Sequence, residues 1–163
     1  MKTDRDDIKV VQMANEVLLP QVVALLHENH TVTLPLRGRS MRPFLEDGRD
    51  KALLEAVKER PQVGDAVLAE ISKGHYVLHR IVAIDGDKVT LRGDGNLSDE
   101  HCLIDDIRAK AIGFYRKGRT RPDSTSGRKW RIYSWWWTHL FPIRRYLLFA
   151  FHPHIPRFLK PQQ

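Results

Sequence analysis

The sequence predicts a mainly β fold, with short helices before the strands and an aromatic, basic helical segment after them. Its clearest feature is three strand-like runs at 66–71, 75–84 and 88–92, joined by Ser72-Lys73-Gly74 and Asp85-Gly86-Asp87. Short apolar-rich runs separated by such turn residues are typical of antiparallel hairpins. We therefore expect a three-stranded meander whose middle strand, largely apolar on both faces, is interior.

The rest of the chain is organised around this meander. Apolar residues at helical spacing, interrupted by Pro20, predict one broken or two short helices at the N-terminus. A strand at 31–36 opens the β domain, and a strand at 111–115 closes it. The predicted segments are a helical 1–30, a β domain 31–115, a basic linker 116–129 and an aromatic-basic segment 130–163.

Charge is distributed unevenly along the chain. Residues 108–163 hold 13 of the 27 Lys and Arg but only one of the 20 Asp and Glu, Asp123. Such asymmetry is typical of a neutral or acidic domain followed by a basic tail that meets an anionic surface or partner. The N-terminal helices lack the glycine turn and basic face of a DNA-reading motif, so nucleic acid is not an expected partner.

Several protein classes are disfavoured by composition. The single cysteine, Cys102, cannot form an intramolecular disulfide and supports no metal site, and nothing indicates a cofactor. The first residues are too charged for a secretory signal, and no run approaches the roughly 20 apolar residues of a membrane span. We expect a cytoplasmic protein, peripheral on the inner face of the membrane if its tail binds there.

Three features could together supply nucleophilic catalysis. Ser40 lies in a glycine-proline turn just past a strand end, which fixes the backbone and leaves the hydroxyl accessible. His79 lies on the middle strand of the meander, and the loop 92–100 is rich in carboxylates. A serine, a histidine and a carboxylate are nucleophile, general base and orienting group. Alternatively, His79 is a core histidine satisfied by a hydrogen bond.

Four motifs resemble the signal peptidase and LexA-like serine peptidase superfamily. They are GRSMRP at 38–43, VGDAV at 63–67, HRIV at 79–82 and GDGN at 93–96, in the family's order. The resemblance covers residues 31 to about 114. The histidine in place of the more common lysine resembles the endoplasmic-reticulum and archaeal branch.

The resemblance implies coiled antiparallel sheets and peptide-bond hydrolysis. Ser40 would attack the scissile carbonyl and its backbone N–H would bind the oxyanion, while His79 would take the proton. Asp99 or Asp94 would orient the imidazole, with Glu100 a further alternative. Met41 and Pro43, which follow the nucleophile closely, would contact substrate.

The expected substrate is an intracellular peptide or protein leader. Two alternatives remain. A self-cleaving regulator of the LexA type would need a small-residue–glycine site before the serine, and residues 1–39 contain no Ala-Gly or Cys-Gly. A non-catalytic adaptor could use the same groove to bind peptides without cleaving them.

The C-terminal segment has three interpretations. Trp130, Trp135, Trp136 and Trp137 are interleaved with arginines, as in chains that lie in a membrane interface. The same residues could form a helix that covers an exposed face of the core, or could dock a nucleic acid or protein.

Overall fold

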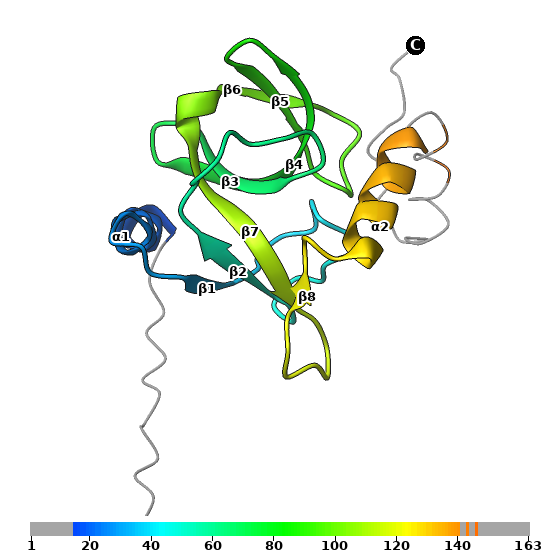
Figure 1. Cartoon of the computed structure of the whole chain (residues 1–163), viewed down its shortest axis with the longest axis horizontal. Helices are drawn as coiled ribbons and strands as arrows, with labels where there is room; N and C mark the ends of the chain where they lie inside the picture. Colours follow the sequence, from blue (N-terminus) through cyan, green and yellow to red (C-terminus); the bar gives the residue numbers. More distant parts are fainter. Residues whose placement is uncertain (1–14, 141–142, 144–145, 147–163) are drawn as a thin grey trace, which may run out of the picture.

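The computed structural model describes residues 15–140, 143 and 146. Within them, the predicted mainly β fold is confirmed: eight strands form an antiparallel sheet, with one helix before them and another after them (Figure 1). In chain order the elements are α1 (Asn15–His27), β1 (Val32–Pro35), β2 (Lys51–Glu55), β3 (Ala66–Ser72), β4 (His75–Asp85), β5 (Lys88–Arg92), β6 (Glu100–Leu103), a 3-10 turn (Ile104–Asp106), β7 (Ile107–Tyr115), β8 (Asp123–Ser124) and α2 (Arg128–His139).

The sheet has the strand order β1-β2-β7-β3-β4-β5-β6, and β8 pairs with β7. Its strands β3, β4 and β5 are consecutive antiparallel neighbours, so the predicted meander is confirmed. Register shifts in the β3–β4, β3–β7 and β4–β5 ladders mark bulges, which increase the local twist and bend of strands. Strands β3 to β6 accordingly curl round in the upper part of Figure 1.

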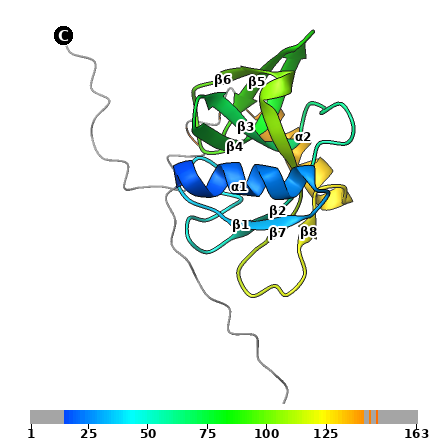
Figure 2. The same ribbon diagram turned by 90° about the vertical axis from the view of Figure 1, so that its left-hand side faces the viewer.

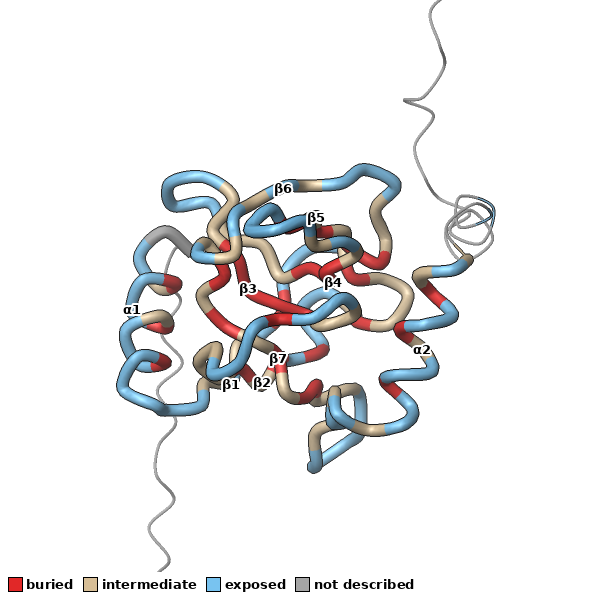
Figure 3. Tube along the Cα trace, turned by 45° about the horizontal axis from the view of Figure 1, so that its top comes forward, coloured by how far each residue is buried: buried red, intermediate tan, exposed pale blue. Residues whose placement is uncertain are grey.

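Two apolar clusters fill the fold. Strand β3 is buried along most of its length and contributes to both clusters (Figure 3). The smaller cluster lies among the curled strands and includes Val67, Ile81 and Leu91. Cys102 packs against it half-buried, and burial raises the pKa of its thiol to about 11, as expected of a packing residue.

Helix α1 lies across one side of the sheet (Figure 2). It buries Leu19, Val22 and Leu26, which follow one another at helical spacing, in the larger cluster. The helix continues through Pro20, so the predicted break at this residue is wrong. Proline removes one hydrogen bond of the helix, and the buried stripe on the same helix offsets that loss. The helical positions expected before residue 15 lie outside the described residues.

The C-terminal half departs from the expected linker and tail. Residues 123–124 form β8 on the sheet, and α2 packs against the domain on the side opposite α1 (Figure 1). Trp130, Ser134 and Trp137 of α2 are buried. The face of α2 that carries these three residues therefore packs against the core, as one of the three interpretations expected. What was expected of 141–142, 144–145 and 147–163 lies outside the described residues. No helix in the described part of the chain is long and apolar enough to cross a membrane.

Candidate active site

The turn that carries Ser40 is held against the sheet from both ends. At its start, the Leu36 amide donates to the Asp50 carbonyl at 3.0 Å. The buried Asp50 carboxylate accepts from the Glu46 amide at 2.9 Å. Met41 is buried in the larger cluster, and Arg42 joins Pro43 through a cis peptide bond. The sequence GRSMRP therefore places its serine on a turn anchored by its neighbours.

Two glycines of the loop after β5 pack directly on this turn. The Gly95 amide donates to the Ser40 carbonyl at 2.7 Å. A Cβ at Gly93 would collide with that same carbonyl oxygen, and one at Gly95 would lie 2.7 Å from the carbonyl oxygen of Arg39. Glycine is required at both positions because the two backbones touch. The GDGN motif is thus the support of the serine turn, a role that spacing in the sequence did not reveal.

His79 is the buried titratable group of the site. It lies on β4 opposite Val67 of β3, and its side chain is 3% exposed, so the predicted burial is confirmed. Its Nδ1 lies 2.7 Å from Oε2 of Glu100, within the distance of an ion pair. Neither atom has another hydrogen-bond partner among the described residues. Burial lowers the pKa of His79 below its ordinary 6.5, and the charge of Glu100 opposes this shift without cancelling it.

Glu100, at the start of β6, is therefore the carboxylate that the structure places on the imidazole. The two carboxylates expected there are engaged elsewhere. Asp99 is paired with Arg92, and Asp94 is paired with Arg80. The sequence-based expectation that Asp94 or Asp99 orients His79 does not match this geometry, because each of these carboxylates is paired with an arginine.

Asp94 lies next to the site and connects β4 to helix α2. Its carboxylate accepts from Nε and Nη2 of Arg80 at 2.9 and 2.8 Å and from the Tyr133 hydroxyl at 3.1 Å. Its carbonyl accepts from Nε1 of Trp137 at 2.9 Å. The Arg80 guanidinium also lies over the ring of Trp130, 4.4 Å from its centroid. Helix α2 is thereby tied to the loop that supports Ser40.

Ser40, His79 and Glu100 line one pocket of about 290 Å³. Its apolar wall comes from the serine turn and from β4, and comprises Leu36, Met41, Leu45, Tyr76, Val77 and Leu78. Asn96 adds an amide, and Arg37 and Glu46 add charges. Pro43 does not line this pocket, whereas Met41 does. Asn96 was not singled out from the sequence, in which it is one polar residue of a polar loop.

One edge of β4 is open where it borders the pocket. Strand β3 pairs with β4 from His75 to Arg80, whereas β5 pairs with it only from Arg80 onward. Within the described sheet, the backbone of residues 75–79 therefore pairs with a neighbouring strand on one side only. Residues 76–79 line the pocket. An extended peptide can add to such an edge as a further strand.

This arrangement combines a hydroxyl, a neutral imidazole and a carboxylate around an open pocket. It is suited to nucleophilic attack with general-base assistance. Within the described residues no group of three or more His, Cys, Asp or Glu side chains could hold a metal ion. Neither a scan against protein-family models nor a search of curated proteins finds a match to this chain.

Proposed function

We propose that this protein is a serine peptidase in which Ser40, His79 and Glu100 act together on an extended peptide. The observation that carries the proposal is the convergence of these three side chains on one pocket, with His79 Nδ1 2.7 Å from the Glu100 carboxylate. The three residues come from the serine turn, from β4 and from β6, so only the folded chain brings them together.

In the proposed reaction, Ser40 Oγ bonds to the carbonyl carbon of the scissile peptide and its proton passes to Nε2 of His79. The proton then moves to the leaving amine as the C–N bond breaks, and water hydrolyses the acyl-serine by the same route. Glu100 favours the tautomer that keeps the proton on Nδ1 and stabilises the imidazolium. A buried, neutral His79 is available as base at neutral pH.

The developing oxyanion needs hydrogen-bond donors. The Ser40 amide is one, as the resemblance implies, and the Asn96 side chain is a second. The Asn96 amide nitrogen and Ser40 Cβ each lie 3.0 Å from the point where a Gly93 Cβ would stand. Asn96 Nδ2 and Ser40 Cβ are therefore separated by at most twice 3.0 Å. A donor so placed typically contributes roughly 3 kcal/mol to the transition state.

The open edge of β4 and the apolar wall of the pocket favour an extended peptide as the substrate. Backbone hydrogen bonds along 76–79 would supply affinity, and the pocket would select side chains on one side of the cut. A leader segment of a peptide or protein has this form, because a segment without stable structure can enter as a strand.

A mass-spectrometric peptide-library assay tests the proposal. We expect wild-type protein to cleave a subset of peptides, and Ser40→Ala and His79→Ala each to abolish cleavage. Ser72→Ala and His30→Ala are matched controls, because both residues are exposed and neither lines the pocket, so both variants should leave cleavage unchanged.

The alternatives predict different outcomes in the same assay. A non-catalytic adaptor would retain peptides without cleaving any of them under any condition. A self-cleaving regulator would instead yield shortened wild-type chains during storage, with Ser40→Ala intact. Cleavage that survives Ser40→Ala would contradict the proposed nucleophile.

A further inference from the structure

Helix α2 has a second face that the domain does not use. Trp130, Tyr133, Ser134 and Trp137 of α2 face the domain, whereas the exposed residues 131, 132, 135 and 136 lie on its outer side. Figure 3 shows α2 with buried and exposed positions alternating along its length. Ile132, Trp135 and Trp136 are 59%, 55% and 55% exposed. They follow one another at helical spacing and therefore form one stripe. With Arg128 and Arg131 they line a groove of about 420 Å³, which we call the α2 outer face.

The charged side chains beside the α2 outer face are all basic. Arg128, Lys129 and Arg131 are exposed on α2, and the helix contains no Asp or Glu. No acidic residue follows Asp123 in the whole sequence. A second copy of the same face would therefore set like charges against each other, which disfavours a symmetric dimer through it. The occupant that complements the face is anionic.

The apolar centre narrows the choice among anionic partners. Two tryptophans lie edge to face, 5.2 Å apart between ring centroids, with an isoleucine beside them and the basic residues on adjacent positions. Indole rings are enriched at the level of lipid headgroups, where an apolar ring and a polar N–H are both satisfied. An aromatic stripe next to arginines is the form of a helix that lies in the interface of an anionic membrane.

We propose that the α2 outer face docks the protein on an anionic lipid surface, with Trp135 and Trp136 inserted among the headgroups. This proposal is independent of the peptidase activity, because none of the residues of the face lines the pocket of Ser40. The inner face of α2 stays fixed through Arg80 and Asp94, so the helix would dock without leaving the domain.

Co-sedimentation of the full-length protein with vesicles tests the proposal. We expect it to sediment with vesicles of equal parts phosphatidylcholine and phosphatidylglycerol and to remain in solution with pure phosphatidylcholine. Its tryptophan emission should shift to the blue with the first kind of vesicle. The single variants Arg128→Gln and Arg131→Gln should each bind these vesicles about fivefold more weakly than wild type. The double variant Trp135→Ala, Trp136→Ala should weaken it on the order of 100-fold.

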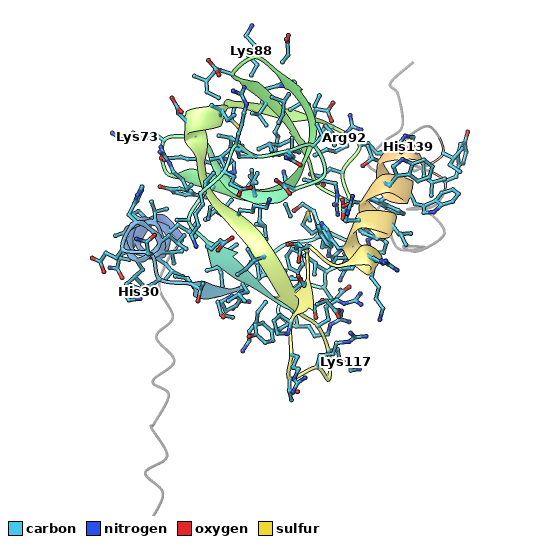
Figure 4. The ribbon with its side chains drawn as sticks, in the orientation of Figure 1. His30, Lys73, Lys88, Arg92, Lys117 and His139 are labelled. Atoms are coloured by element: carbon cyan, nitrogen blue, oxygen red, sulfur yellow. The ribbon has the colours of Figure 1, made fainter. Side chains whose placement is uncertain are left out.

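Controls separate docking from general effects of charge or hydrophobicity. Leu103→Ala removes a side chain of similar exposure from β6, and Lys73→Gln removes a charge on the side of the molecule away from α2 (Figure 4). Both should bind like wild type. The thermal unfolding of the double variant should match wild type, since Trp135 and Trp136 are not part of the core. Absence of binding to the anionic vesicles, or undiminished binding by the double variant, would overturn the proposal.

Discussion

The buried pair of Arg80 and Asp94 makes a sharp prediction about stability. Both side chains are 1% exposed, and the carboxylate accepts three hydrogen bonds, two of them from the guanidinium. Asp94→Asn keeps the size of the side chain but removes its charge. The guanidinium would then remain buried without a counter-charge, and breaking a buried pair from one side costs about 3–5 kcal/mol.

That loss is large beside the roughly 5–15 kcal/mol by which domains are stable. At about 2–4 °C per kcal/mol for a chain of this size, Tm should fall by roughly 6–20 °C. Urea unfolding followed by tryptophan fluorescence measures the change, because Trp130 and Trp137 contact this pair.

Asp99→Asn is the matched control. It breaks the Arg92–Asp99 pair, in which the Asp99 side chain is 31% exposed. Its partner Arg92 is 13% exposed, so water reaches both charges, and this variant should lose less stability than Asp94→Asn. If Asp94→Asn cost no more than Asp99→Asn, the structural role assigned to Asp94 would be wrong.

Three further predictions concern activity in the peptide assay. Glu100→Gln should lower kcat by about 100- to 10,000-fold through loss of the correct imidazole tautomer, whereas equal losses in Glu100→Gln and Asp99→Asn would refute the assignment of Glu100. Because burial lowers the pKa of His79 below 6.5 and the base must be neutral, kcat/KM should stay level down to about that pH and decline only below it. An acid limb centred above that value would contradict a buried neutral base. Asn96→Ala should reduce kcat by about 100- to 1,000-fold with little change in KM, and an unchanged kcat would remove Asn96 from the oxyanion site.

Much of the fold was predictable because its signals are local. The turn residues at 72–74 and 85–87 and the short apolar-rich runs beside them are properties of neighbouring residues, and they predicted β3, β4 and β5 correctly. The break at Pro20 was wrong because the local preference of proline competes with burial of Leu19, Val22 and Leu26, which only packing against the sheet provides.

The candidate site was predictable in part. Ser40 and His79 could be selected from their positions at a strand end and on an interior strand. The choice among Asp94, Asp99 and Glu100 could not be made from the sequence, because all three lie in one short loop and spacing does not show where each side chain points. It depends on Arg80 and Arg92, whose side chains pair with the first two carboxylates and leave the third beside His79.

Turns and helical spacing depend on near neighbours, so they were enough to predict which residue types could carry chemistry and on which elements they lie. Three further points became known from the fold alone: which carboxylate meets the imidazole, why Gly93 and Gly95 must be glycines, and which face of α2 remains exposed. Each of these depends on contacts between segments distant in the chain. A pattern along one segment does not encode what packs against it.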